Sequence, residues 1–370
     1  MSFSKTLAWA LLLVALLEAF RQAHAVSYDD LIGGIPDSED EPQLIGWQGE
    51  KHRAQEDGLH SLHSPNDTSG EPWIQVISWK PRAAIYHNFL SDREAKHIVN
   101  VAKSYMQRSQ VVSKEGISEI RTSYGTFIRR NFDPVIAAVE ERVSLWSQLP
   151  VSHQEDLQVL RYGPTNKYGA HLDGEERVAT VLIYLVEPDE GGETAFVNSQ
   201  WMHKELGQQV AASGLSKCAQ GHVTVKPKRG DALIFYDLKP DFKTLDPNGR
   251  HTGCPVIKGV KWNAVKWIHG KPYDPESYET AKASYAPPRP DPGDCGDYHK
   301  QCKKWADGGE CKKNPGYMQG GSGQLGTCRL ACGACEVCEK GDEECTSRNR
   351  QRGGFLDLTP EQLAAELKGL

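Results

Sequence analysis

Four residues of this chain have types and spacing that suit metal-dependent chemistry. His171 and Asp173 form an HxD motif, His251 follows much later, and Lys261 stands ten positions after it. Two imidazoles and one carboxylate bind one face of an octahedral Fe(II) and leave three positions for a bidentate co-substrate and O₂. The ammonium group of Lys261 would pair with the far carboxylate of a dicarboxylate. The pattern therefore predicts a non-haem iron oxygenase that consumes 2-oxoglutarate.

The elements that must position these residues follow from hydrophobic patterning. Two helices are predicted, one capped by Ser91 and running to Ala102, and one that begins at Asp133-Pro134. Short runs rich in Val, Ile, Tyr, Phe and Trp then predict strands at 157–162, 177–186, 231–238 and 261–268. The HxD motif follows the first run, and His251 precedes the last. We expect an α+β fold whose core is a double-stranded β-helix, or jelly roll, supported by helices.

The sequence around the four residues is more specific than the HxD motif, which a chain with 13 histidines can contain by chance. Four separated motifs occur at residues 160–162 (LRY), 168–173 (YGAHLD), 191–194 (GGET) and 251–269, the last beginning HTGCPVIKGVKW and ending WIH. Over residues 73–272 the chain resembles prolyl 4-hydroxylases of the plant and algal type. The resemblance implies Fe(II) held by His171, Asp173 and His251, with 2-oxoglutarate and O₂ as co-substrates and ascorbate as reductant.

The same resemblance implies further roles. Lys261, Tyr162 and Thr194 would bind 2-oxoglutarate, although ordinary buried hydrogen bonding is an alternative for the phenol and the hydroxyl. A peptide groove would use Arg121, Ser123, Glu155, Tyr168, Arg177, Trp267 and His269. Aromatic faces and partners for free carbonyls suit a polyproline II chain, which has no internal hydrogen bonds. Only residues 174–176 separate Asp173 from Arg177, a shorter loop than relatives usually have, which indicates a different peptide preference.

The amino-terminal sequence predicts entry into the secretory pathway. Residues 1–25 contain Lys5, an apolar run and an A-x-A cleavage site, and are typical of a signal peptide. An uncleaved membrane anchor is the alternative, although the run is shorter than the roughly 20 residues that a span requires. Residues 26–72 predict an acidic, flexible linker, and Asn66 begins a glycosylation sequon. We expect the endoplasmic reticulum lumen, with the Golgi, membrane anchorage or secretion as alternatives, and no nucleic-acid partner, because no basic block occurs.

Ten cysteines support this location, because disulfides persist in oxidising compartments. After a Pro-rich linker (273–294), whose residues 287–292 predict a stiff extended spacer, six cysteines lie within residues 295–335. Spacing alone allows 15 connectivities. The segment resembles a ShK toxin-like (ShKT) domain, which implies the pairs Cys295–Cys335, Cys302–Cys328 and Cys311–Cys332. We further pair Cys218 with Cys254 and Cys338 with Cys345. Zinc binding by Cys332, Cys335 and Cys338 is the weaker alternative, and the partner of this domain is unknown.

Residues 336–370 form a Cys-containing tail. Thr359-Pro360-Glu361 predicts the start of a short helix that carries Leu363 and Leu367. We expect a marginal terminal helix, with docking to a partner as the alternative.

Together these features predict a peptidyl-proline 4-dioxygenase of the procollagen-proline type, which hydroxylates C4 of proline and decarboxylates 2-oxoglutarate to succinate. Proline-rich secreted or cell-wall proteins are the expected substrates, rather than collagen-type chains, because no extra peptide-binding domain precedes the catalytic region. Alternatives are another peptidyl 2-oxoglutarate oxygenase, such as a lysyl hydroxylase, or an inactive extracellular interaction protein. Lys261 disfavours the first alternative, and the complete ligand set disfavours the second.

Overall fold

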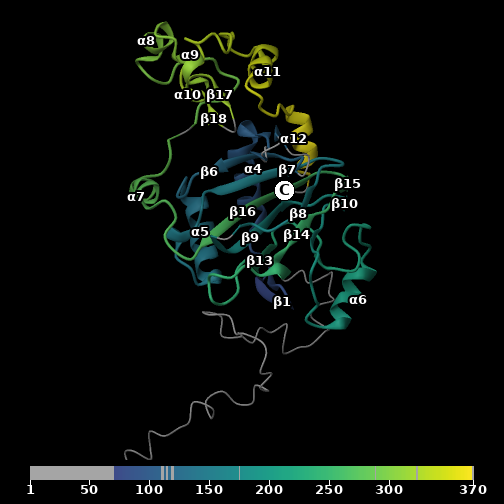
Figure 1. The fold of residues 1–370 in the computed structure, drawn as a ribbon. Helices are drawn as coiled ribbons and strands as arrows, with labels where there is room; N and C mark the ends of the chain where they lie inside the picture. Colours follow the sequence, from purple (N-terminus) through teal and green to yellow (C-terminus); the bar gives the residue numbers. More distant parts are fainter. Residues whose placement is uncertain are drawn as a thin grey trace, which may run out of the picture. The chain divides into compact units, whose positions relative to one another are not determined.

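Eight antiparallel strands form the largest sheet of the protein (Figure 1). The computed structural model describes residues 71–109, 112–113, 116–117, 121–174, 176–287, 289–321 and 324–368. The predicted signal peptide, the sequon at Asn66 and nearly all of the acidic linker lie outside these residues. Within the described ranges, no helix has both the length and the apolar character that crossing a membrane requires.

The strands of the large sheet follow the order β1-β2-β13-β9-β16-β7-β6-β3, and each pairs with its neighbour antiparallel. The four predicted strands correspond to its central members β7, β9, β13 and β16. The bounds are β1 (Trp73–Trp79), β2 (Arg82–His87), β3 (Gln107–Arg108), β6 (Tyr124–Ile128), β7 (Leu157–Tyr162), β9 (Arg177–Val186), β13 (Ala232–Tyr236) and β16 (Lys261–His269).

A second antiparallel sheet has the order β12-β11-β14-β8. Its strands have only three or four residues each, too few for hydrophobic alternation to reveal them in the sequence. They are β8 (Tyr168–His171), β11 (Thr194–Phe196), β12 (Val223–Val225) and β14 (His251–Gly253). Two further antiparallel pairs of short strands lie outside both sheets. They are β4 (Val112–Ser113) with β5 (Gly116–Ile117), and β10 (Glu190–Gly191) with β15 (Val256–Lys258).

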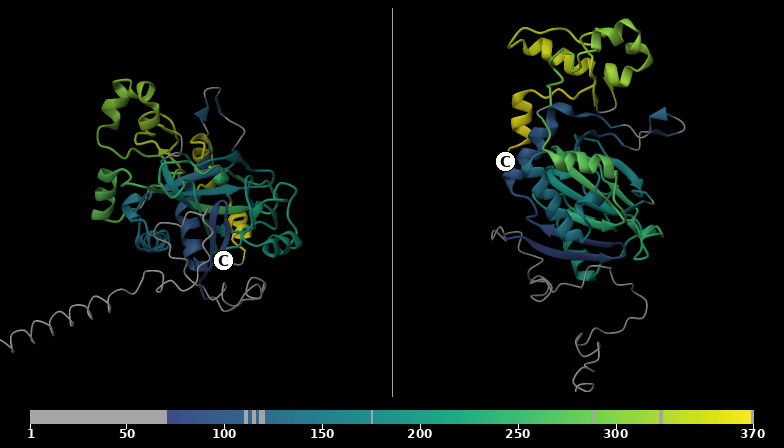
Figure 2. Two further views of the ribbon diagram at one scale, coloured as in Figure 1. Left: turned by 60° about the horizontal axis from the view of Figure 1, so that its bottom comes forward. Right: turned by 90° about the vertical axis from the view of Figure 1, so that its left-hand side faces the viewer.

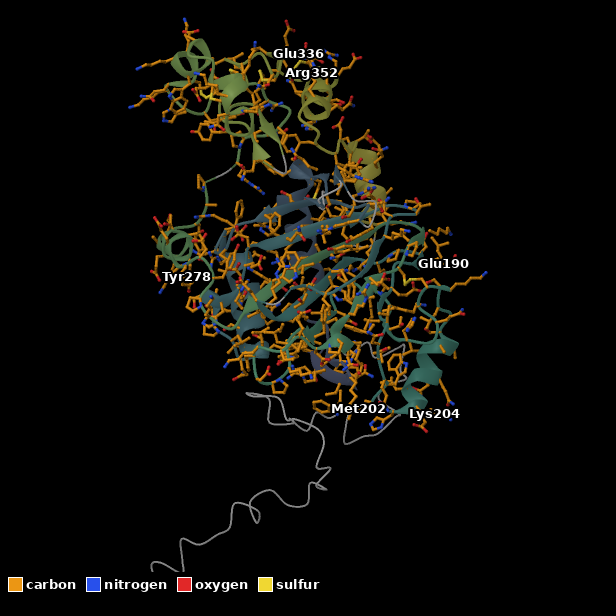
Figure 3. The ribbon with its side chains drawn as sticks, in the orientation of Figure 1. Glu190, Met202, Lys204, Tyr278, Glu336 and Arg352 are labelled. Carbon is orange, nitrogen blue, oxygen red and sulfur yellow. A yellow bond between two sulfur atoms is a disulfide. The ribbon has the colours of Figure 1, made fainter. Side chains whose placement is uncertain are left out.

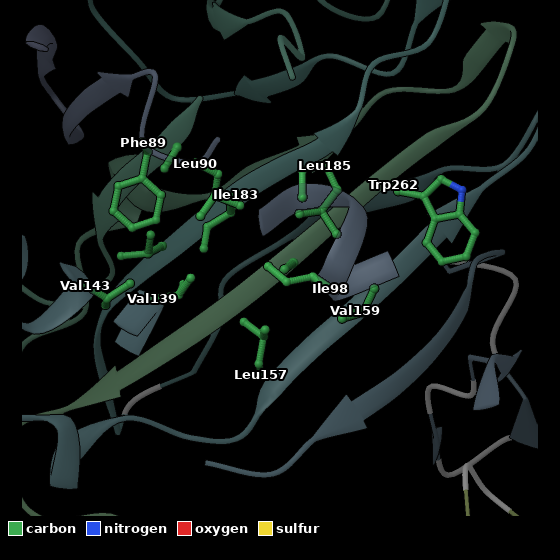
Figure 4. Packing of buried hydrophobic residues seen from close by; sticks show 14 of the residues in the cluster. Phe89, Leu90, Ile98, Val139, Val143, Leu157, Val159, Ile183, Leu185 and Trp262 are labelled. Atoms are coloured by element: carbon green, nitrogen blue, oxygen red, sulfur yellow. The ribbon is translucent and has the colours of Figure 1, made fainter. Parts of the chain in front are cut away.

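Helices α4 (Asp92–Ala102) and α5 (Pro134–Ser147) contribute to the main apolar core with the large sheet. Ser91 forms a capping box with Glu94, and the Asp133 side chain accepts two backbone N–H groups of α5, as the sequence predicts. Short 3₁₀ turns occur at Lys103–Tyr105, Val151–His153 and Pro247–Gly249. Figure 4 shows the buried contact between these helices and the sheet, with Ile98, Val139, Val143, Leu157, Val159, Ile183, Leu185 and Trp262 labelled.

A second apolar cluster joins the two sheets. Phe196 of β11 packs edge-on against Phe235 of β13, with ring centroids 5.2 Å apart, and Tyr184 of β9 is fully buried beside them. Helix α6 (Lys204–Ala212) adds Leu206 to this cluster. The two sheets therefore pack against each other, and the protein has the mixed helix and sheet fold, with a large antiparallel sheet, that the sequence predicts.

Residues 273–294, which the sequence predicts as a Pro-rich linker, contain a helix and make contacts with other parts of the protein. Asp274 caps a helix, α7 (Pro275–Ala283), and Arg130 donates to the carbonyl oxygens of Tyr273 and Asp274 at 2.7 and 3.2 Å. The guanidinium of Arg289 lies 3.9 Å from the Tyr105 ring centroid. The linker therefore contains a helix that the sequence analysis did not predict, and it packs on the part of the protein that contains the large sheet.

The Cys-rich module (residues 295–335) contains short elements around a small core of Cys302, Met318 and Cys328. They are α8 (Cys302–Asp307), α9 (Glu310–Lys313), α10 (Pro315–Met318), β17 (Gly320–Gly321) and β18 (Gln324–Leu325). The disulfides join the same pairs as the sequence analysis names, Cys218–Cys254, Cys295–Cys335, Cys302–Cys328, Cys311–Cys332 and Cys338–Cys345, and leave no thiol free for zinc among the described residues.

The tail forms α11 (Glu343–Arg352) and α12 (Pro360–Glu366). Arg352 lies 3.8 Å from Glu336, and both are labelled in Figure 3. Figure 2 shows α12 beside the large sheet, where Leu363 and Leu367 join the main core. The short terminal helix begins where the sequence predicts, and it docks on the main core of its own chain, a contact that the sequence analysis did not include.

Candidate active site

The ends of two neighbouring strands bring the three predicted metal ligands together. His171 is the last residue of β8, His251 is the first residue of β14, and the two are partners in the register of the small sheet. Asp173 follows β8 by two residues. One ligand atom from each of these three side chains lies within 4.8 Å of the others, and this is the one such cluster found among the described residues.

Hydrogen bonds orient both imidazoles for a metal. The Nδ1 atoms of His171 and His251 lie 2.8 and 3.1 Å from the carbonyl oxygens of Gly169 and Gly249. A carbonyl oxygen only accepts, so each Nδ1 carries the hydrogen and each Nε2 presents a lone pair. Asp173 Oδ1 lies 3.2 Å from Nε2 of His171 and 4.0 Å from that of His251. Two Nε2 lone pairs and a carboxylate oxygen thus converge, which is a donor set that fits Fe(II).

The charge states of the ligands also suit a cation. Burial lowers the pKa of His251 to about 4, so this ring is neutral near pH 7. Burial acts to raise the pKa of Asp173, but the neighbouring imidazoles of His251 and His171 and a hydrogen bond from Thr180 outweigh it and lower that pKa. The site therefore offers neutral imidazole and ionised carboxylate.

Two residues that the sequence analysis missed hold Asp173 in place. Thr180 Oγ1 lies 2.7 Å from Asp173 Oδ2 and 2.9 Å from Asp237 Oδ2. Burial, and then the charge of Asp173, raise the pKa of Asp237 well above its ordinary value. A hydroxyl has one proton to donate, so a protonated Asp237 supplies the second hydrogen bond. No local motif distinguishes Thr180 or Asp237, because their proximity depends on the pairing of β9 with β13.

Lys261 begins β16 and lines the same pocket as the three ligands. Its side chain is 4% exposed, and its Nζ donates to the carbonyl oxygen of Gly192 at 2.7 Å. Burial lowers its pKa to about 8, with the charge of Glu193 acting in the opposite direction. A buried cation without a carboxylate at bonding distance is costly, so the pocket is suited to an anionic ligand.

The other two predicted 2-oxoglutarate residues lie next to this cation. Tyr162 of β7 is the register partner of Lys261, whose Nζ lies 5.6 Å from the Tyr162 ring centroid. Thr194 lines the pocket and accepts a hydrogen bond from Tyr184 at 3.1 Å. Both side chains are buried, so the pocket places a cation, a phenol and a hydroxyl together.

Part of the predicted peptide groove forms the pocket wall around the ligands. Tyr168 stacks on His171 with ring centroids 3.7 Å apart, and the guanidinium of Arg121 lies 4.9 Å from the Tyr168 centroid. Arg121 also donates to Ser123 Oγ at 3.2 Å and to Gln158 at 2.9 Å. Ser123 is fully buried and does not line the pocket, and its hydroxyl also donates to Ser109 Oγ at 2.9 Å.

The remaining predicted groove residues form one connected group at the other end of β16. The Glu155 carboxylate accepts hydrogen bonds from Arg177 at 2.7 and 3.1 Å and lies 2.8 Å from His269 Nε2. The guanidinium of Arg177 stacks 3.7 Å from the Trp267 centroid. Arg177 also donates to the Asp173 carbonyl oxygen at 2.9 Å, so it spans from the metal cluster to Glu155.

Further residues near this group were not identified from the sequence. Asn263 is 2% exposed, lines the pocket, and has an Oδ1 without a hydrogen-bond partner in the described structure. The buried Lys266 Nζ lies 2.6 Å from Glu140 and donates to the Glu155 carbonyl oxygen at 2.7 Å. A lysine amid apolar strand residues is a usable signal for a buried ion pair, because lysine is almost never buried unpaired.

Comparison with known proteins agrees with this geometry. Residues 157–269 match the model of the 2OG-Fe(II) oxygenase superfamily. The Arabidopsis thaliana protein named prolyl 4-hydroxylase 2 is 39% identical over 289 residues, which cover 74% of this chain and 92% of that relative. The probable prolyl 4-hydroxylase 4 of the same plant is 40% identical over 276 residues, and this match covers 71% of this chain and 88% of that relative.

Among solved structures, the viral collagen prolyl hydroxylase of Paramecium Bursaria Chlorella virus-1 in its 2OG complex is 25% identical, with a TM-score of 0.37, and the match covers 51% of this chain and 96% of the viral chain. The extent and identity of the plant matches settle the assignment. The chain therefore belongs to the prolyl 4-hydroxylase family of 2-oxoglutarate and Fe(II) oxygenases.

Proposed function

We propose that this protein hydroxylates C4 of peptidyl proline and converts 2-oxoglutarate to succinate and CO₂. The observation that carries the proposal is the single pocket in which His171, Asp173 and His251 lie together with the buried cation Lys261. The family membership supports the same reaction. No observation of the described residues favours the alternative functions, a lysyl hydroxylase or an inactive interaction protein.

Different residues of the site would bind the metal, 2-oxoglutarate and the peptide. His171, Asp173 and His251 would hold Fe(II), which supplies O₂ activation when bound. Lys261 Nζ would exchange the Gly192 carbonyl for the distal carboxylate of 2-oxoglutarate, with hydrogen bonds from Tyr162 and Thr194. Tyr168, Arg121 and Trp267 would orient the proline ring, while Arg177 and Glu155 bind the carbonyl and N–H groups of the extended chain.

Several finer features belong to the proposal. The two packed antiparallel sheets are the halves of a jelly roll, and residues 73–272 are the catalytic domain. The Cys-rich module is a ShKT domain, which the three disulfides within residues 295–335 support. Five disulfides also favour the secretory pathway, with the endoplasmic reticulum lumen as the site of action. Ascorbate is the reductant, and proline-rich secreted or cell-wall proteins are the substrates.

The test is direct. The purified oxidised protein is incubated with Fe(II), ascorbate, 2-oxoglutarate and either polyproline or a collagen-like peptide. Added oxygen is mapped by mass spectrometry, and amino-acid analysis distinguishes 4-hydroxyproline from its 3-isomer. The proposal requires 4-hydroxyproline in one peptide with an equal amount of succinate. Oxygen on lysine, or no turnover with iron bound, would reject it.

A further inference from the structure

A cleft of about 730 Å³ is lined by Glu155, whose partner Arg177 stacks on the pocket residue Trp267. Phe127 of β6, together with Glu155, belongs to one wall, and Tyr298 and Leu325 of the Cys-rich module belong to another. Tyr273, next to α7, also lines it. We call this space the module cleft. The catalytic region and the module both contribute to it.

A row of side chains connects the pocket to the module cleft. On β16, Lys261, Asn263 and Trp267 line the pocket. His269 continues the strand, and its ring stacks on Tyr273 with centroids 4.8 Å apart. Since Tyr273 lines the module cleft, this row of side chains joins the wall of the pocket to the wall of the cleft.

Glu155 links the module cleft to the pocket through Arg177. Its carboxylate is bonded to Arg177, which stacks on the pocket residue Trp267, and the residue also lines the module cleft. The cleft thus begins where the proposed peptide contacts of the active site end. Continuity with the proposed substrate groove argues that the same substrate occupies it.

Three of the exposed side chains that line the cleft are aromatic. Phe127 is 48% exposed, Tyr298 is 41% exposed and Tyr273 is 37% exposed. Aromatic side chains that flank a groove are the usual recognition surface for polyproline II chains, whose backbone has no internal hydrogen bonds to lose.

Charged side chains that line the cleft make contacts within the protein itself. Arg130 donates to the Tyr273 and Asp274 carbonyl oxygens, and Arg289 lies over Tyr105. Asp156 accepts the Arg130 backbone N–H at 3.0 Å. With its cations and carboxylates paired in this way, the cleft suits an uncharged chain better than a polyanion.

We propose that the module cleft is a second subsite for the proline-rich substrate, in which Phe127 of β6 and Tyr298 of the Cys-rich module hold part of a polyproline II chain outside the hydroxylation pocket. The proposal rests on the proposed function. It gives the module a role in retaining long substrates, because a short peptide fills the pocket without reaching the cleft.

The test compares substrate lengths in the full chain. One labelled polyproline peptide has about 20 residues, roughly 60 Å as a polyproline II helix, and another has about five residues, roughly 15 Å. Fluorescence anisotropy gives Kd for each with wild type, Phe127→Ala and Tyr298→Ala. Tyr317→Ala is the matched control, because Tyr317 lies in the same module, is 45% exposed and does not line the cleft.

We expect each cleft variant to weaken binding of the long peptide by about five- to tenfold, as removal of an aromatic anchor typically does. The short peptide and the Tyr317→Ala protein should behave as wild type. Equal Kd values for the long peptide in wild type and both cleft variants would overturn the proposal. So would equal weakening by Tyr317→Ala, or stronger competition by polyglutamate than by unlabelled polyproline.

Hydroxyproline formation is measured in parallel with the wild type and all three variants. Absence of hydroxyproline, despite tighter binding of the long peptide that depends on Phe127 and Tyr298, would reject the proposed reaction and support the subsite. Hydroxylation with kcat/KM independent of peptide length in all proteins would reject the subsite and leave the reaction standing.

Discussion

The indole nitrogen of Trp262 donates a hydrogen bond of 2.9 Å to Glu366, so the last helix of the chain is tied to the strand that begins with Lys261. Arg161 of β7, next to Tyr162, donates to the same carboxylate at 3.0 Å. The tail therefore contacts β16 and β7 through residues that are next in sequence to Lys261 and Tyr162, which line the active-site pocket. Its contribution to stability can be measured.

Replacing Leu367, which is 9% exposed and belongs to the main core, by Ala should lower the free energy of unfolding by about 2–3 kcal/mol, because a buried leucine loses apolar contacts and leaves a cavity. Urea unfolding of the oxidised protein measures this. Leu145→Ala on α5 is the matched control, since Leu145 is 72% exposed and its loss should cost little. Equal effects of the two changes would show that α12 does not contribute to the core.

Removing one metal ligand should greatly weaken metal binding and abolish turnover. In His171→Ala, two donors remain of the three, so Mn(II), used as a stable substitute for Fe(II), should bind at least a hundredfold more weakly in calorimetry, by the scale of ligand effects on affinity. His203→Ala changes an exposed histidine and should bind as wild type does. Unchanged Mn(II) affinity in His171→Ala would refute the ligand assignment.

Thr180→Val should weaken metal binding without unfolding the protein. The change keeps the side-chain shape but removes the hydroxyl that bonds Asp173 Oδ2. Loss of such a supporting hydrogen bond typically costs about 10–100-fold in metal affinity. Thr126→Val is the control, because Thr126 is equally buried and its hydroxyl has no partner in the described structure. If both variants bind Mn(II) equally well, Thr180 does not position Asp173.

The affinity for 2-oxoglutarate should fall as the pH rises above about 8. The pKa of Lys261 is lowered to about 8 by burial, so above this pH the empty pocket increasingly holds a neutral amine that must take up a proton to pair with a carboxylate. Each further pH unit costs about 1.4 kcal/mol, or tenfold in affinity, up to the pKa that Lys261 has when it is paired with the carboxylate.

Calorimetry at pH 8.5 in two buffers of different ionisation enthalpy measures this proton uptake. Lys261→Arg is the matched variant, since guanidinium stays charged and should show no uptake. Zero uptake by the wild type would contradict the role of Lys261.

Breaking the buried ion pair should destabilise the protein more than removing it. Lys266→Met leaves Glu140 uncompensated among buried groups and should cost about 3–5 kcal/mol. Adding Glu140→Gln removes the uncompensated charge, so the double variant should regain part of this loss in urea unfolding. If the double variant loses the sum of the unfolding free energies lost by the two single variants, the two side chains act independently.

The sequence by itself determined the parts of this protein whose information is local. Capping groups at Ser91 and Asp133 and an apolar face every three to four residues define α4 and α5. Alternating or continuous β-branched runs define the long strands of the large sheet, and the motif around His251 and Lys261 was sufficient to predict the chemistry of the pocket. These features depend on residues that are near one another in the chain.

Only the tertiary structure decided which distant residues meet. Asp237 and Thr180 reach Asp173 through strand pairing, and Glu155, Arg177 and His269 assemble from three segments. The short strands of the small sheet have too few residues to show alternation. The tail helix has little stability of its own, and its docking depends on apolar surface that exists only after the large sheet has formed. Contacts of this kind depend on sheet register and packing, which no local pattern specifies.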